Sequence, residues 1–268
     1  MGDSETLRVL FVGDLVGKAG RRVLDEHLGR LVDSRRVDFT IVNVENAADG
    51  LGVTPEIAEG LLSVEIDCLT SGNHIWDRAE IRHYIAGEPR LLRPANYPRD
   101  LPGAGSYLGE TAAGVPVGVV NVMGRVFMPP VDDPFRAARE AADRLRARTP
   151  IVVVDMHAEA SSEKQAMGWH LDGTVSAVLG THTHVQTADE RVLPGGTAYI
   201  TDVGMTGPYD SVIGMEKQAS LARFLTQAHG RMASARGDAR LCAVLVEIET
   251  LGGRARSIER LMIPGSGS

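Results

Sequence analysis

Eight residues with metal-binding or proton-transferring side chains follow short apolar runs at five places in the chain. They are Asp14, Glu45, Asn46, Asn73, His74, His157, His182 and His184. Carboxylate and imidazole groups are the usual ligands of zinc, iron and manganese, and a carboxamide oxygen can complete a site for a hard ion. His182 and His184 stand two residues apart, which places both imidazoles on the same side of an extended chain. The pattern predicts metal binding.

Each of these residues also has an ordinary structural interpretation. Asp14 could cap a helix or form an Asx turn, and Asn46 and Asn73 are good turn residues. Glu45 could be an exposed loop charge, and His157 a hydrogen-bonded side chain in the interior. Their coincidence at five strand ends favours a common metal site. Some seven such groups exceed the needs of one tetrahedral ion but suit two ions that share a carboxylate. Two ions about 3.5–4 Å apart activate a hydroxide and stabilise in-line displacement at phosphorus.

The segment GDLVGKAG invites comparison with a phosphate-binding loop. That motif needs four residues between its first glycine and the Gly-Lys pair, followed by Ser or Thr. Only three residues separate Gly13 from Gly17, and Ala19 follows Lys18. We therefore interpret the glycines as letting the chain leave a strand beside a metal.

The elements that position these residues alternate along the first two thirds of the chain. Short β-branched runs predict strands, and apolar residues at helical spacing predict helices. Predicted strands are 7–12, 38–44, 66–70, 115–122, 151–155, 175–179 and 197–201, and predicted helices are 20–32, 54–64, 77–86 and 135–148. Repeated alternation favours an α/β fold with a parallel sheet, whose ligands bind beyond the carboxyl ends of the strands.

The remaining segments have a different character. Residues 87–108 are rich in Pro, Gly and Arg and are expected to loop over the surface, and residues 123–134 are a candidate lid. The runs 240–249 and 256–263 follow one another without a helix, which predicts an antiparallel pair. No composition break or internal repeat divides the chain, so we expect one domain over residues 1–268.

Composition excludes several classes of protein. The chain has 268 residues, of which 43% are hydrophobic and 24% charged, and a net charge of -7. The negative charge argues against stable binding of long nucleic acid, including nuclease action. Two cysteines exclude a disulfide framework. No apolar run approaches a membrane span, and the acidic start MGDSET lacks the positive charge of a signal peptide. We therefore expect a cytoplasmic protein without a membrane partner.

The order of these motifs resembles the calcineurin-like metallophosphoesterase superfamily, whose signature is G-D, then G-N-H, a separate His, and G-H-x-H. This chain has Gly13-Asp14, Gly72-Asn73-His74, His157 and Gly180-Thr181-His182-Thr183-His184. The segments GDLVGKAGRR, NVENAADGLGVTP, GNHIWD, MGRVFMPP, HAEASSEK and GTHTHVQTAD further resemble the YmdB-type subgroup of bacterial phosphodiesterases. The resemblance implies central β-sheets flanked by helices in a four-layer αββα sandwich.

The resemblance also implies two metal ions, most often iron or manganese, with zinc as an alternative. It assigns Asp14, Glu45, Asn46 and His184 to one ion, and Glu45, Asn73, His157 and His182 to the other, with Glu45 bridging. Val16 stands where the superfamily has a histidine ligand, and Glu45 replaces its bridging aspartate. Asn46 would supply the missing ligand. His74 would donate a proton to the leaving oxygen rather than bind metal.

The implied substrates are cyclic nucleotides, 2′,3′-cyclic ones especially, cleaved by a metal-bridging hydroxide. Arg125 could contact phosphate and Phe127 or Trp169 could stack on a base, although a solvated turn and core packing explain these residues equally well. An alternative function is regulation by binding a nucleotide or a protein, with structural metals. A homo-oligomer is compatible with the sequence, but no residue specifies it.

Overall fold

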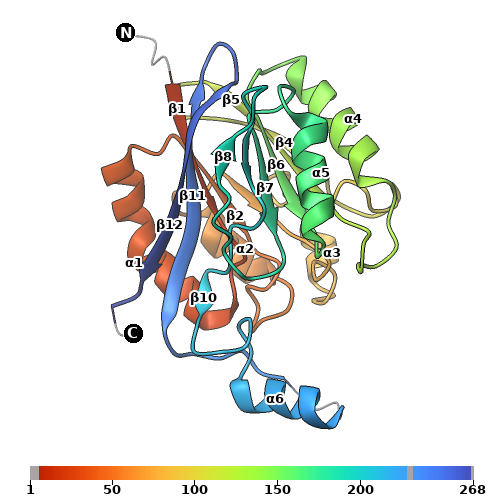
Figure 1. Cartoon of the computed structure of the whole chain (residues 1–268), viewed down its shortest axis with the longest axis vertical. Helices are drawn as coiled ribbons and strands as arrows, with labels where there is room; N and C mark the ends of the chain where they lie inside the picture. The colour runs from red at the N-terminus through yellow and green to blue at the C-terminus, as the bar shows by residue number, and fades with distance from the viewer. Residues whose placement is uncertain (1–5, 228–231, 267–268) are drawn as a thin grey trace.

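Two six-stranded β-sheets lie at the centre of the molecule, with helices on their outer sides (Figure 1). This computed structural model describes residues 6–227 and 232–266. The acidic start of the chain, residues 1–5, therefore lies outside the described residues. Among the helices that are described, none is long and apolar enough to cross a membrane.

The first sheet combines parallel pairing of three strands with antiparallel pairing of three others around one long strand. Its order is β10-β11-β1-β2-β3, and β12 pairs with β11 outside this path. The strands are β1 (Thr6–Val12), β2 (Phe39–Asn43), β3 (Cys68–Thr70), β10 (Gly207–Pro208), β11 (Ala239–Glu249) and β12 (Ala255–Pro264). The predicted antiparallel pair near the C-terminus is confirmed as β11 and β12.

The second sheet is parallel at its centre. Its order is β4-β5-β6-β7-β9-β8, with β5, β6, β7 and β9 parallel and the two edge strands antiparallel to their neighbours. The strands are β4 (Ser106–Glu110), β5 (Pro116–Met123), β6 (Val152–His157), β7 (Ala177–Thr181), β8 (Arg191–Val192) and β9 (Ala198–Ile200).

Alternation of side chains along the strands builds a core of three apolar layers. In β1, Val9 and Phe11 belong to the cluster between the two sheets, whereas Leu10 and Val12 pack on the helical side. Helices α1 (Gly17–Arg35) and α2 (Pro55–Leu62) cover the first sheet, and α4 (Pro134–Arg146) and α5 (Ser161–Leu171) cover the second. The expected four-layer αββα arrangement is confirmed. The central cluster contains residues of both sheets.

Local signals explain where two of the helices begin. The Thr54 side chain accepts a hydrogen bond from the backbone N–H of Ile57, and Pro55 occupies the first position of α2. Asp133 caps α4 by accepting hydrogen bonds from the backbone of Phe135 and Arg136. Such side chains satisfy backbone donors that have no partner within a helix.

Two expectations about the chain after β3 are corrected. The predicted helix over residues 77–86 is reduced to α3 (Ile81–Tyr84). The segment 87–108 does not simply loop over the surface, because Leu91 and Leu92 are fully buried. The backbone N–H of Leu92 donates to the carbonyl of Leu69, so this segment lies beside β3. Backbone pairing there overrides the Pro- and Gly-rich composition.

The sequence pattern did not predict α5, α6 (Lys217–Thr226) or the short strands β4, β8 and β10. Two of the buried residues of α5 are charged, Glu163 and Lys164, which interrupts the apolar spacing of that helix. Helix α6 projects from the end of the body and buries only Ser220. An exposed helix has no continuous apolar face packed on the core and gives a weak signal.

Candidate metal centre

The ends of five parallel strands bring all eight predicted residues to one place. Asp14 follows β1, Glu45 and Asn46 follow β2, and Asn73 and His74 follow β3. His157 ends β6, while His182 and His184 follow β7. Because the first three strands belong to one sheet and the last two to the other, the site is built jointly by both sheets.

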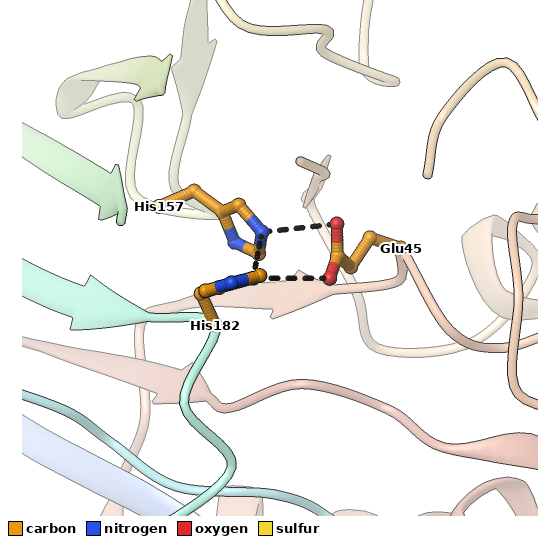
Figure 2. A group of neighbouring side chains, drawn as sticks. All are labelled: Glu45, His157 and His182. Atoms are coloured by element: carbon orange, nitrogen blue, oxygen red, sulfur yellow. Dashed lines mark hydrogen bonds and ion pairs between the residues drawn. The ribbon is translucent and has the colours of Figure 1, made fainter. Parts of the chain in front are cut away.

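One group of side chains consists of Glu45, His157 and His182, which point toward one another in Figure 2. His157 Nε2 lies 3.0 Å from Glu45 Oε2, and His182 Nδ1 lies 3.9 Å from Glu45 Oε1. One potential ligand atom from each residue lies within 4.8 Å of the others. This spacing allows a single cation to be shared by all three.

A second group consists of Asp14, Glu45 and His184, whose potential ligand atoms also lie within 4.8 Å of one another. Asn46 adjoins this group: its Nδ2 donates to Glu45 Oε1 and lies next to His184 Nε2, each at 3.0 Å, and only its Oδ1 could bind a metal. Glu45 is therefore common to both groups. Its two carboxylate oxygens can face two neighbouring cations.

Asn73 and His74 lie at the edge of the first group. Asn73 Oδ1 is 3.2 Å from His157 Nε2. The backbone N–H of His74 donates to Glu45 Oε2 at 3.3 Å. The His74 ring contacts Asp77 instead, with 2.8 Å between Nδ1 and Asp77 Oδ2. The His74 side chain is 30% exposed. His74 is thus next to the centre but partly open to solvent.

Two features show that this place fits metal ions. Asp14 Oδ1 is buried and has no hydrogen-bond partner within the described part of the chain, a costly arrangement unless something else binds it. Gly72 leaves space in the centre: a Cβ there would come within 2.2 Å of both Glu45 Oε2 and His157 Nε2. The donor set of carboxylates, carboxamides and imidazoles suits iron, manganese or zinc.

The buried carboxyl groups of the centre favour the binding of a cation. Burial raises the pKa of Asp14 well above its usual value, and the charges of Asp202 and Glu45 raise it further. Burial would also raise the pKa of Glu45, but the imidazoles of His157 and His182 hold it well below its usual value. Burial lowers the pKa of His157 to about 4, so its ring is neutral at pH 7, the form that binds metals.

A buried network beneath the centre orients His157, and the sequence reasoning missed it. His157 Nδ1 lies 2.9 Å from Thr181 Oγ1, whose hydroxyl donates to Asp155 Oδ1 at 2.6 Å. Since the Thr181 proton is used for Asp155, His157 donates from Nδ1 and keeps Nε2 free as a ligand. Asn43 Nδ2 and the Thr70 hydroxyl also donate to Asp155, which ties the first sheet to the second.

A second set of contacts that the sequence did not predict holds the loop that carries His182 and His184. Both histidines have positive φ, 99° and 65°, a conformation that costs non-glycine residues on the order of 1–3 kcal/mol each. Between them, the backbone N–H and hydroxyl of Thr183 donate to Asp202, at 3.1 and 2.8 Å. Lys164 neutralises Asp202. The position of Asp202 directly after a predicted strand was the signal that could have found it.

The three residues considered for substrate contacts, Arg125, Phe127 and Trp169, are all exposed. Phe127 is 89% exposed and Trp169 is 54% exposed, so core packing was the wrong interpretation for both. Trp169 lies under the Arg191 guanidinium, 5.6 Å from its ring centroid. Arg125 pairs with Asp133 at 3.5 Å, and Glu163 accepts hydrogen bonds from the backbone N–H of Arg125. The start of the candidate lid is thus tied to α5.

The chain is similar to known proteins over nearly its whole length. The chain is 48% identical over 258 residues to the 2′,3′-cyclic-nucleotide 2′-phosphodiesterase of Bacillus subtilis, which covers 96% of this chain and 97% of that relative. A crystal structure of a hypothetical protein from Thermus thermophilus has a TM-score of 0.88 and 44% identity, covering 96% of this chain and 99% of the other. A phosphatase structure from Mycoplasma pneumoniae has a TM-score of 0.90 and 32% identity, covering 97% and 94%. A sequence model of the family described as YmdB-like protein matches residues 10–261, and the chain therefore belongs to that family.

Proposed function

We propose that this chain hydrolyses 2′,3′-cyclic nucleotides at a centre of two metal ions. Its general class, a phosphoester hydrolase, follows from its family and from the named activity of the Bacillus subtilis relative, which it matches over nearly the whole length of both chains. The observation that carries the proposal is the position of Glu45 in both groups of metal-binding side chains.

In this proposal each ion has four protein ligands, and Glu45 is common to both. Asp14, Glu45, Asn46 and His184 hold the first ion, and Glu45, Asn73, His157 and His182 hold the second. The contacts of the other ligands support these sets, and Asn46 would turn its carboxamide to present Oδ1 to the first ion. Such ions, when bound, supply an activated water and neutralise charge on the phosphoryl oxygens.

His74 is the proposed proton donor to the leaving oxygen. Its backbone N–H binds the shared carboxylate of Glu45, which keeps the residue beside the reacting group. Asp77 accepts from Nδ1 of the ring and orients it, leaving Nε2 for the substrate. A histidine that is partly open to solvent can exchange its proton between turnovers, as a general acid must.

The test uses hydrolysis of 2′,3′-cyclic AMP by metal-depleted protein, before and after manganese or iron is added. We expect turnover to return with metal and to fall by about 10²–10⁴-fold in His74→Ala, the usual contribution of a general acid. The same variant must retain its metal ions, because His74 is not a ligand in this proposal. His83→Ala, a change at an exposed histidine of α3, is the matched control.

The results separate the proposal from its alternative. If the metals bind and 2′,3′-cyclic AMP stays intact, phosphodiester hydrolysis is wrong as the main role. A regulatory function with structural metals would then be favoured. If His74→Ala loses its metal, the role given to His74 is wrong even where hydrolysis is observed.

A further inference from the structure

A positively charged hollow lies beside the metal centre, although the chain as a whole carries a net charge of -7. Its larger part has a volume of about 730 Å³, within the range of pockets that hold small ligands. An adjoining part of about 210 Å³ is lined only by Lys18, Ala19, Arg22 and Arg236. We call these two parts, together with Arg78 on the wall of the larger one, the basic hollow.

Three cations of the basic hollow have no acidic partner in the part of the chain that the structure describes. Within residues 6–227 and 232–266, no carboxylate forms an ion pair with Lys18, Arg22 or Arg236. Two acids, Asp49 and Glu216, line the larger part, but neither lines the smaller one. In the smaller part, Lys18, Arg22 and Arg236 gather without a lining carboxylate, which favours an anionic ligand, and phosphate suits them best.

The hollow and the metal centre share a wall. That wall is the loop 46–51, which follows the shared metal ligand Glu45. Arg78 Nη2 donates to the carbonyl of Ala48 at 2.8 Å, and Arg78 Nε donates to the carbonyl of Leu51 at 3.1 Å. On the other side, the backbone N–H of Gly17, next to Lys18, donates to the carbonyl of Asn46 at 2.9 Å. A ligand in the hollow therefore lies against the loop that carries the centre.

Residues that line the hollow come from α1 and from the segments that flank α6. The start of α1 and the segment leading to α6 lie at the same end of the molecule in Figure 1, where the chain leaves β1 and β2. Glu216 comes just before α6, and Ser234 lies against Gly17, with 3.0 Å between its Oγ and the place of a Cβ on that glycine.

We propose that the basic hollow binds the phosphate groups of a phosphate-rich ligand, next to but apart from the metal centre. Two sources of such phosphates are distinguishable. They could belong to the body of a short oligonucleotide whose 2′,3′-cyclic end is hydrolysed, or to a free polyphosphate. The first source rests on the proposed function, and the second does not.

The first arm of the test compares two substrates of the metal-loaded enzyme, 2′,3′-cyclic AMP and a trinucleotide that ends in a 2′,3′-cyclic phosphate. In Lys18→Ala/Arg236→Ala, we expect KM for the trinucleotide to rise about tenfold relative to KM for 2′,3′-cyclic AMP, and its salt dependence to become shallower. The matched control is Arg144→Ala/Arg146→Ala, two changes in the last turn of α4. It should leave the ratio of the two KM values as in the wild type.

The second arm measures tripolyphosphate binding by calorimetry to the wild type and to the same two double variants. Binding that is lost in Lys18→Ala/Arg236→Ala but kept in the α4 control assigns phosphate binding to the hollow, even if no substrate is hydrolysed. Together with an unchanged ratio of the two KM values, the same result assigns the hollow to a free polyphosphate. The proposed function fails if 2′,3′-cyclic AMP is not hydrolysed, and this arm still decides on the hollow. Unchanged KM ratios together with unchanged tripolyphosphate binding would overturn the proposal.

Discussion

The ammonium group of Lys164 lies 2.6 Å from the carboxylate of Asp202, and neither side chain has any exposed surface. Lys164 comes from α5 and Asp202 follows β9, so the pair joins a helix to the sheet that it covers. Asp202 also accepts from both the N–H and the hydroxyl of Thr183. The ion pair thus supports the strained loop that presents His182 and His184.

Lys164→Met is expected to destabilise the protein strongly. The change leaves the charge of Asp202 buried without its cation, which costs roughly 3–5 kcal/mol when one partner of a buried pair is removed. Urea unfolding measures the loss. Lys217→Met, which removes an exposed pair with Asp210, should cost less than about 1 kcal/mol. Equal stability of the two variants would show that the buried pair does not support this loop.

Thr181→Val is expected to weaken metal binding while the fold is retained. Valine keeps the shape of threonine but cannot accept the hydrogen bond from His157 Nδ1. Loss of such a supporting contact lowers metal affinity by about 10–100-fold. Metal titration with a competing chelator measures the change, and Thr181→Ser, which keeps the hydroxyl, is the control. Wild-type affinity in the valine variant would mean that the hydroxyl does not select the ring tautomer.

Gly72→Ala is expected to abolish metal binding. The added methyl would come within 2.2 Å of Glu45 Oε2 and His157 Nε2, so one of these side chains must move. Gly60→Ala is the matched control, because a Cβ on that helical glycine meets nothing within 4 Å. The control should be stabilised by about 0.5–1 kcal/mol. Full metal content in Gly72→Ala would contradict the crowded geometry around this glycine.

Glu45→Gln is expected to empty both metal positions, whereas His184→Ala should empty one. Glu45 belongs to both groups of side chains, and His184 belongs to only one of them. The metal content measured by elemental analysis should then fall from about two ions per chain to near zero in Glu45→Gln and to about one in His184→Ala. The same loss in both variants would argue against a shared carboxylate.

The sequence alone was sufficient to find eight residues that the structure brings together. Each comes at or just after the end of an apolar run, and the carboxyl ends of parallel strands meet at a common edge of the sheet. Asn73 and His74 are adjacent in the sequence, and His182 and His184 are only two residues apart. The sequence itself therefore places the members of each pair close together. The alternation of short β-branched runs with amphipathic ones also predicted a sheet of parallel strands covered by helices. The arrangement of two sheets in four layers was implied only by the resemblance to the metallophosphoesterase superfamily.

The tertiary structure decided which groups lie behind and beside those residues. Asp155 binds Asn43, Thr70 and Thr181 from three other strands, and no local pattern links residues so far apart. Lys164 is buried because Asp202 neutralises it, so a charge that the sequence alone would place in solvent becomes part of the core. The basic hollow likewise joins Lys18, Arg78 and Arg236. Burial and charge depend on partners in space, which the chain reveals only when it is folded.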